Sequence, residues 1–157
     1  MPKITPCLWF DTEGEEAAEL YTSLIPNSRI VEIHRYGAGG PRPEGTVMTV
    51  DFELDGQRLV ALNGGPQYTF TEAVSFMVNC ETQEEVDRYW DTLCEGGEPG
   101  PCGWLKDRFG LSWQIIPSAL ARLLGDPDRD KAQRVMQAML CMGKIEIDGL
   151  ERAAAQA

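Results

Sequence analysis

The chain has 157 residues, of which 43% are hydrophobic, and it carries a formal net charge of −11. This length suits one domain, and we expect residues 1–157 to form a single domain with a substantial buried core. The acidic balance argues against nucleic acid and anionic membranes as partners, because phosphate groups need a basic surface. No apolar run reaches the roughly 18 residues of a membrane-spanning helix, and the first residues lack the apolar stretch of a signal peptide.

The five cysteines indicate a reducing environment. They form an odd set without a C-x-x-C pair, which argues against a disulfide framework and against a zinc knuckle. We therefore expect a cytoplasmic protein. The five are Cys7, Cys80, Cys94, Cys102 and Cys141.

The first half of the chain reads as a strand, a helix and three further strands. Apolar alternation and turn residues set the boundaries, and Asp55-Gly56 is a strong two-residue hairpin turn. Residues 37–45 are too rich in glycine and proline for regular structure. The expected elements are a strand at 4–10, a helix at 13–24, and strands at 29–36, 47–54 and 58–62.

The second half begins with the same order and then becomes helical. Its second strand is poorly marked, because residues 95–101 are mostly glycine, proline and glutamate. The tail at 145–155 has an apolar face that a monomer could leave uncovered, which predicts a homodimer contact. The expected elements are a strand at 73–78, a helix at 84–93, a hairpin of 104–108 and 111–116 across Phe109-Gly110, and helices at 119–124 and 128–142.

Two helical stripes recur about 69 positions apart. Each places apolar residues at i, i+3, i+4 and i+7, the spacing with which one helix face packs on a sheet. Each also follows a Thr-x-x-Glu box, from Thr12 and from Thr82, that can cap a helix start. The paired residues are Glu16, Ala17, Leu20, Tyr21 and Leu24 in the first stripe, and Glu85, Val86, Tyr89, Trp90 and Leu93 in the second.

This repeat predicts an α+β fold of two βαβββ modules that form a curved mixed sheet with a cleft. Module 1 spans about 4–65, module 2 about 71–117, and a helical extension covers 118–157.

The chain resembles the vicinal oxygen chelate superfamily, which includes glyoxalases, extradiol dioxygenases and bleomycin-resistance proteins. It is more similar to the PhnB-like branch, whose members are often labelled 3-demethylubiquinone-9 3-methyltransferase domain proteins. The segments that carry the resemblance are spread over residues 4 to about 142. They are 5–11 (TPCLWFD), 25–28 (IPNS), 35–37 (RYG), 62–65 (LNGG), 102–107 (CGWLKD), 110–114 (GLSWQ) and 130–136 (DKAQRVM).

The resemblance implies a divalent metal in the enzymes of the superfamily, held by His, Glu or Gln on the first and fourth strand of each module. In this chain those positions fall at Thr5 or Cys7, Val60 or Ala61, Ala73 or Ser75, and Gln114. Gln114 alone could ligate in this manner, and one neutral amide does not hold Zn²⁺, Ni²⁺ or Fe²⁺. We therefore expect no metal and no cofactor.

His34 is the only histidine, and it lies on a strand away from those positions. A general base needs a neighbour to orient it, and the sequence supplies only Glu32 on the same strand face. A structural or solvent-facing role is the favoured interpretation of His34.

The methyltransferase label requires a nucleotide-type cofactor site, with a glycine-rich turn between a strand and a helix. The glycines at 37–40 precede Pro41-Arg-Pro43, which cannot open a helix, and those at 64–65 lead toward another strand. The sequence gives no physical support for methyl transfer.

The remaining candidates describe a pocket. Strand alternation points Thr5, Cys7 and Trp9 toward the cleft and Leu8 and Phe10 toward the first helix. Neutral polar groups and aromatic walls suit a flat, partly apolar small molecule. The predicted ligand-binding residues are Thr5, Cys7, Trp9, Asn63, Ser75, Trp104 and Gln114, whereas Trp113 is expected in the core.

The function that this pattern favours is metal-independent binding of an unidentified small molecule by a homodimer. One alternative is an enzyme of undefined substrate that works through Cys7, His34 or a group on the substrate; the pattern decides neither for nor against catalysis. For Cys7, lining of the core or the cleft is the favoured interpretation. The third possibility is a structural or interaction protein whose cleft is vestigial and filled by side chains, among them Trp9 and Trp104.

Overall fold

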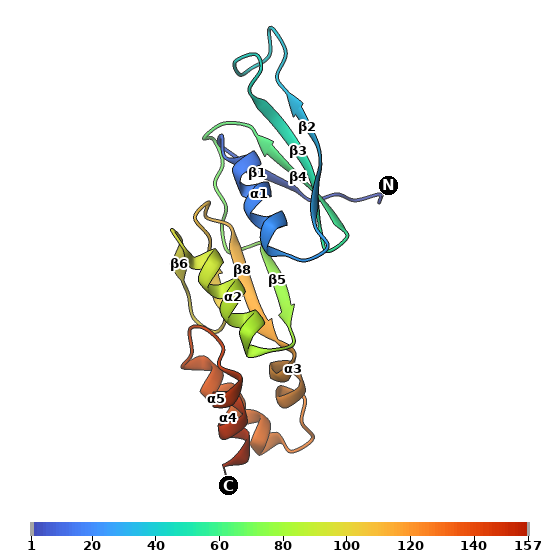
Figure 1. Cartoon of the computed structure of the whole chain (residues 1–157). Coiled ribbons are helices and arrows are strands. Elements are labelled where there is room, and N and C mark those ends of the chain that lie inside the picture. Colours follow the sequence, from blue (N-terminus) through green and yellow to red (C-terminus); the bar gives the residue numbers. More distant parts are fainter. Residues whose placement is uncertain (1, 157) are drawn as a thin grey trace. The chain divides into compact units, whose positions relative to one another are not determined.

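The structure is a computed structural model that describes residues 2–156. The chain divides into two compact units: unit 1 ends at Phe70 and unit 2 begins at Thr71. Each unit contains its own four-stranded mixed sheet and a helix packed on it (Figure 1). The predicted α+β fold of two modules with C-terminal helices is confirmed, and a cleft shared by the modules stays a prediction.

Unit 1 has the order βαβββ, with β1 parallel to β4 and the other pairs antiparallel. The order across its sheet is β1-β4-β3-β2. Its elements are β1 (Cys7–Phe10), α1 (Gly14–Leu24), β2 (Arg29–Arg35), β3 (Val47–Leu54) and β4 (Gln57–Asn63).

The first strand is shorter than predicted: it begins at Cys7, whereas the sequence predicted a start at residue 4. Pro6 has no backbone N–H, although its carbonyl still accepts from the amide of Val60 at 3.0 Å. The predicted alternation is confirmed: Leu8 and Phe10 are buried, Cys7 is exposed and Trp9 is half-buried.

Helix α1 packs its predicted stripe against the sheet, but its cap is not the predicted one. Residue Glu13, not Thr12, occupies the N-cap position, and it makes no side-chain cap bond. Instead, Asn63 Oδ1 on β4 accepts a hydrogen bond of 2.7 Å from the amide of Gly14. A Cβ at Gly14 would lie 2.7 Å from that oxygen, so the close approach requires glycine.

The hairpin between β3 and β4 turns at the predicted dipeptide. Asp55 and Gly56 have φ values of 49° and 83°. Positive φ at both central residues defines the type I′ turn, whose twist matches that of the strands it joins.

Unit 2 repeats the order and adds three helices. Its sheet has the order β5-β8-β7-β6, with β5 parallel to β8. The poorly marked second strand is present but contains two residues. The elements are β5 (Ser75–Cys80), α2 (Gln83–Cys94), β6 (Glu98–Pro99), β7 (Trp104–Lys106), β8 (Ser112–Pro117), α3 (Ser118–Leu124), α4 (Arg129–Leu140) and α5 (Ile147–Ala155).

Helix α2 follows both sequence predictions. The Thr82 side chain accepts a hydrogen bond of 3.2 Å from the amide of Glu85, so Thr82 caps the helix as predicted. The second stripe is buried against the sheet, and Trp113 lies in the same core as predicted. The buried stripe consists of Val86, Tyr89, Trp90 and Leu93.

The apolar face of the C-terminal tail is covered within unit 2. Ile145 and Leu150 are fully buried in one cluster with Val135 of α4 and Leu120 and Leu123 of α3. The sequence argument for a dimer contact on this face was therefore wrong, because α3 and α4 already cover it. Within residues 2–156, no helix combines the length and apolar character needed to cross a membrane.

Candidate functional site

In unit 1, helix α1 packs on one face of the sheet, and the predicted residues Cys7 and Trp9 lie on the other. Strand register places Cys7 beside Val60 and Trp9 beside Leu62. Side chains alternate between faces along a strand, so these four share the face opposite α1, which we call the α1-distal face. Thr5 is half-buried and precedes β1.

The indole of Trp9 is held by the segment that follows β4. Its Nε1–H donates a hydrogen bond of 2.9 Å to the carbonyl of Gly65, and a Cβ at Gly64 would collide with the ring. Tyr68 contacts Trp9 edge to face, with ring centroids 4.9 Å apart and an interplanar angle of 78°. Because Tyr68 is 66% exposed, the pair presents an aromatic surface to solvent.

Sequence reasoning missed Tyr68. It lies five residues beyond the last residue of β4, in a segment without periodicity. The available signal was Asn63-Gly64-Gly65-Pro66, which turns the chain back and brings the next aromatic residue over the first strand.

Asn63 is placed on the α1 side of the sheet, where its polar groups are already engaged. Beyond its bond to Gly14, its Nδ2 donates to the carbonyl of Val47 at 3.2 Å, and its own carbonyl accepts from the Tyr36 hydroxyl at 2.6 Å. The side chain is 5% exposed. These contacts give Asn63 a structural role at the start of α1.

Cys7 is poorly suited to act as a nucleophile. Partial burial raises the pKa of its thiol above the usual value, which lowers the fraction of reactive thiolate at neutral pH. His34 shares the α1-distal face but lies on β2, and its register partner is Thr49 on β3. The structure shows no hydrogen bond between Cys7 and a base among residues 2–156.

Three predicted residues of unit 2 come together. Gln114 Nε2 donates a hydrogen bond of 3.0 Å to the hydroxyl of Ser75, and Trp104 is the register partner of Gln114 on β7. All three are half-buried. They form a neutral polar group with an aromatic neighbour on the face of the sheet opposite α2.

Ser112 is a further polar residue beside this group, and sequence reasoning missed it. It is fully buried, pairs with Ser75 in the strand register, and its hydroxyl has no hydrogen-bond partner among residues 2–156. A buried hydroxyl without a partner costs about 1–3 kcal/mol, so this position is energetically unfavourable for the fold alone.

The residues at the superfamily metal positions do not fit a metal. Unit 1 offers a thiol with a raised pKa at Cys7 beside the apolar Val60. Unit 2 offers a hydroxyl at Ser75 and an amide at Gln114, which bond to each other. A neutral amide, a hydroxyl and a protonated thiol are poor ligands for borderline divalent ions, so no step of chemistry follows from a metal there.

The glycine-rich segments join strands rather than a strand and a helix. Residues 37–46 connect β2 to the antiparallel β3, and residues 64–74 connect β4 to β5. Neither places a helix N-terminus after a strand, as a nucleotide-type cofactor site requires.

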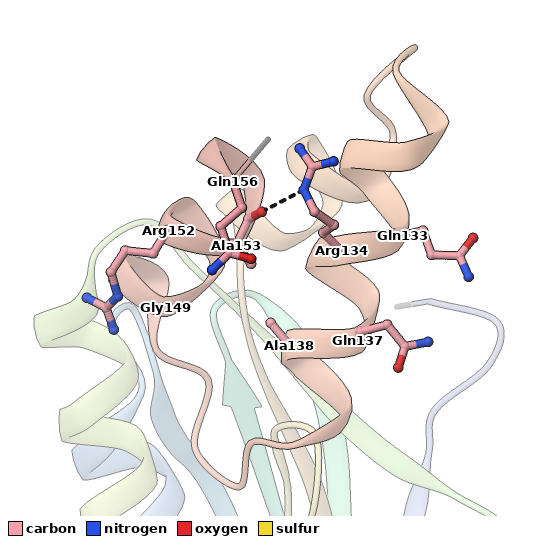
Figure 2. Close-up of a pocket in the computed structure, with 8 residues that line it drawn as sticks. All are labelled: Gln133, Arg134, Gln137, Ala138, Gly149, Arg152, Ala153 and Gln156. Carbon is pink, nitrogen blue, oxygen red and sulfur yellow. Dashed lines mark hydrogen bonds between the residues drawn. The ribbon is translucent and has the colours of Figure 1, made fainter.

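A pocket of about 470 Å³ lies between α4 and α5 and contains none of the predicted residues. Figure 2 shows Arg134 reaching across it toward α5, whereas Gln133 and Gln137 point away. Arg134 donates hydrogen bonds to the carbonyls of Ala153 and Ala154 at 3.1 and 3.0 Å. These carbonyls lie in the last turn of α5, so Arg134 provides hydrogen-bond donors for carbonyl groups that lack a partner within the helix. We therefore interpret the pocket as the packing boundary between α4 and α5.

Comparisons with known proteins agree with this architecture. The profile of a family described as 3-demethylubiquinone-9 3-methyltransferase matches residues 2–116. The PhnB protein from Bacillus cereus, whose description carries the same methyltransferase name, is 39% identical, with a TM-score of 0.68 over 74% of this chain and 100% of that one. No curated protein matches the chain.

Two more distant structures share the fold. A protein from Pseudomonas aeruginosa is 21% identical, with a TM-score of 0.61 over 74% of this chain and 98% of that one. The fosfomycin resistance protein FosX from Listeria monocytogenes is 15% identical, with a TM-score of 0.51 over 75% and 93%.

Two βαβββ units of this topology define a protein of the vicinal oxygen chelate fold. Within that superfamily the chain belongs to the family described as 3-demethylubiquinone-9 3-methyltransferase, the PhnB-like branch. The matched region ends just before α3, so the three C-terminal helices lie beyond the family profile.

Proposed function

We propose that this protein binds a small molecule with a flat, partly apolar ring, and that binding uses no metal at the superfamily positions. The observation that carries the proposal is the Trp9–Tyr68 pair, in which the backbone of Gly65 holds the Trp9 indole and the Tyr68 ring is 66% exposed. Exposed aromatic rings that are fixed by their own backbone contacts bind ligands at a low cost in conformational entropy.

Neutral hydrogen-bonding groups in unit 2 support the same class of ligand. Gln114 uses its amide nitrogen for Ser75, which leaves the carbonyl oxygen of Gln114 as an acceptor. Trp104 lies beside it in the register. A ring with one or two hydroxyl or carbonyl substituents matches this set of groups.

The alternative is an enzyme, and the family description names methyl transfer to a demethylated ubiquinone. That description agrees with a ring-shaped ligand. However, the glycine-rich segments provide no cofactor turn, and the raised pKa of Cys7 disfavours covalent catalysis. Binding without turnover is therefore the function that these residues support best.

We further propose that the protein is a cytoplasmic homodimer. All five cysteines are free thiols, in agreement with a reducing compartment. Since the tail face is covered, the support for a dimer moves to apolar side chains that stay exposed, such as Met77 on β5 and Leu140 on α4, at 57% and 54%. Native mass spectrometry of the purified protein tests the subunit number directly.

Indole N–H signals in a ¹⁵N NMR spectrum test ligand binding, with EDTA present to remove metals. The probes are 1-anilinonaphthalene-8-sulfonate and a planar methoxyphenol, each titrated separately. We expect the Trp9 and Trp104 signals to move. The Trp113 signal should stay, because that indole is buried and donates to Asp107.

Tyr68→Ala should weaken binding of the probes by about threefold to tenfold, which corresponds to the free energy of one aromatic contact. Ile4→Ala is the control, because it truncates another exposed apolar side chain of unit 1, 80% exposed, that carries no aromatic ring. Probes that move none of the four indole signals, or that bind Tyr68→Ala unchanged, contradict the proposal. Binding of S-adenosylmethionine would favour the methyltransferase alternative instead.

A further inference from the structure

Three metal-ligating side chains converge on the α1-distal face of unit 1, on strands β2 and β3. They are Glu32, His34 and Asp51, and one ligand atom from each lies within 4.8 Å of the other two. The chain has 25 acidic residues, five cysteines and one histidine. Within residues 2–156 this is the one such group of three or more, and it includes the sole histidine.

The backbone sets this convergence. Glu32 and His34 are two residues apart on β2 and therefore point to the same face. Asp51 is the register partner of Glu32 on the neighbouring strand, and irregularities in the β2–β3 pairing lie on either side of Glu32 and His34. A bulge increases the local twist of a strand and redirects its side chains. The three groups are thus held by a ladder and not by a mobile loop.

The distances leave room for an ion between the groups. His34 Nε2 lies 3.6 Å from Glu32 Oε2 and 3.9 Å from Asp51 Oδ2. Both separations are too long for a hydrogen bond. Ligands around a tetrahedral Zn²⁺, at about 2.0–2.2 Å from the ion, lie about 3.4 Å from each other. The two separations from His34 Nε2 are slightly longer than that, so binding of an ion requires the carboxylates to move toward the imidazole.

The donor set selects the kind of ion. One imidazole nitrogen and two carboxylate oxygens suit borderline ions such as Zn²⁺, Ni²⁺ and Cu²⁺, whereas Mg²⁺ and Ca²⁺ prefer oxygen ligands alone. Three protein ligands also leave positions for water or for a ligand atom.

Arg58 lies at the edge of the group and competes for it. Its Nη2 is 3.7 Å from Asp51 Oδ2, and its Nη1 is 3.6 Å from Glu53 Oε1. The ion pair between Arg58 and Glu53 can therefore persist when Asp51 coordinates an ion. The positive charge of Arg58 should nevertheless weaken cation binding at this distance, so a neutral substitution of Arg58 should strengthen it.

We propose that Glu32, His34 and Asp51 form a binding site for a divalent ion of the Zn²⁺ class on β2 and β3. The site lies away from the superfamily positions on β1, β4, β5 and β8. It departs from the sequence-based expectation that the chain binds no metal, because the sequence did not show that Asp51 meets the pair Glu32 and His34. It does not depend on the proposed ligand binding, which is measured with EDTA present.

The test is isothermal titration of EDTA-treated, dialysed full-length protein with Zn²⁺ and, separately, Ni²⁺, in a non-coordinating buffer at low salt. Wild-type protein should bind one equivalent. His34→Gln should lower the affinity more than about tenfold, and Asp51→Asn by about tenfold, because each removes a ligand atom. Arg58→Gln should raise the affinity about threefold or more at low salt.

Asp55→Asn is the matched control, since it removes the same charge from the adjacent hairpin turn without touching the three ligands. Its affinity should equal that of wild type. The single histidine gives a second readout, because its imidazole C–H signals must shift with Zn²⁺ and broaden with Ni²⁺.

No binding below about 1 mM in wild type overturns the proposal. Equal affinity in wild type and His34→Gln also overturns it, because the ion would then be held elsewhere, for example by a thiol. Unchanged indole signals in each variant show that a loss of binding is not a loss of fold.

Discussion

The two units close equivalent hairpins by different means. In unit 1 the β3–β4 turn is made by the backbone of Asp55 and Gly56, both at positive φ, and the Asp55 side chain is exposed. In unit 2 the β7–β8 turn is organised by the carboxylate of Asp107, which is 2% exposed. Asp107 Oδ1 accepts from the amides of Phe109 and Leu111, at 2.9 and 3.0 Å.

The helix starts of the two units also differ, but here the local interaction is in unit 2 and the buried polar side chain is in unit 1. Helix α2 is capped locally by Thr82, whereas α1 is capped by Asn63, 49 residues further along the chain. Each unit thus combines one local device with one that depends on a buried polar side chain. The two units therefore share the order of elements and the helix stripes, but they use different interactions to fix their turns and helix caps.

Replacing the buried carboxylate should have the largest effect on stability. Asp107→Ala removes the acceptor used by two backbone amides and by the indole of Trp113, whose Nε1 donates to Asp107 Oδ2 at 2.9 Å. At about 1–3 kcal/mol for each buried donor, we expect a loss of roughly 4 kcal/mol or more. Urea unfolding followed by the indole signals of unit 2 measures it.

Asp55→Ala is the comparison in unit 1. It should cost about 1 kcal/mol or less, because only the preference of aspartate for a left-handed conformation is lost. Asp107→Asn should fall between the two, because the amide keeps one acceptor oxygen. Similar losses for Asp107→Ala and Asp55→Ala would show that the two hairpins are not held differently.

Cysteines on the equivalent first strands of the two units should differ strongly in reactivity. Burial, helped by Glu85 and Glu81, raises the pKa of the Cys80 thiol from 9.0 to about 12. A raised pKa keeps a thiol protonated until higher pH, so at pH 8 Cys80 should have about a thousandfold less thiolate than an ordinary cysteine. The pKa of Cys7 is raised by desolvation, but its side chain is exposed.

Iodoacetamide labelling followed by mass spectrometry at pH 7 to 10 measures both thiols in one sample. We expect Cys7 to be labelled more slowly than a reference peptide and far faster than Cys80. The Cys80 rate should rise tenfold for each pH unit throughout this range. Labelling of Cys80 within tenfold of Cys7 would mean that the end of β5 opens to solvent.

The sequence predicts most of the fold because periodicity is a local property. The two helix stripes, the alternation of Leu8 and Phe10, and the Asp55-Gly56 turn each follow from neighbouring residues. The α1 cap could not be predicted in this way. Asn63 reaches Gly14 through the parallel pairing of β1 and β4, and Thr12 offered a local capping box that tertiary contacts replaced.

The candidate site is less accessible from sequence for the same reason. Ser75 and Gln114 were singled out as cleft-facing residues, and the structure joins them by a hydrogen bond. Their neighbour Ser112 gave no signal, since its partnerless hydroxyl is visible only in three dimensions. Asp51 likewise meets His34 across a strand pair whose bulged register the sequence does not specify.

The two helix caps provide the comparison with the smallest expected effects. Thr82→Ala removes one local cap bond and should cost about 1 kcal/mol in unit 2. Asn63→Ala removes the bond to Gly14 and a second bond to Val47 in a buried setting, so unit 1 should lose about 2–3 kcal/mol. The Trp9 indole signal reports unit 1, and the signals of Trp90, Trp104 and Trp113 report unit 2.

A double-mutant cycle separates the cap bond from general packing. Gly14→Ala alone should destabilise unit 1, because its Cβ would lie 2.7 Å from Asn63 Oδ1. In an Asn63→Ala background that oxygen is gone and the alanine favours the helix, so the same substitution should cost much less. Additive losses would contradict this account, because they would mean that Gly14 is required by another neighbour, such as Ala61, whose Cβ lies 3.3 Å from the same position. Since Thr82 caps its helix from outside the sheet, no glycine of unit 2 should show such coupling to it.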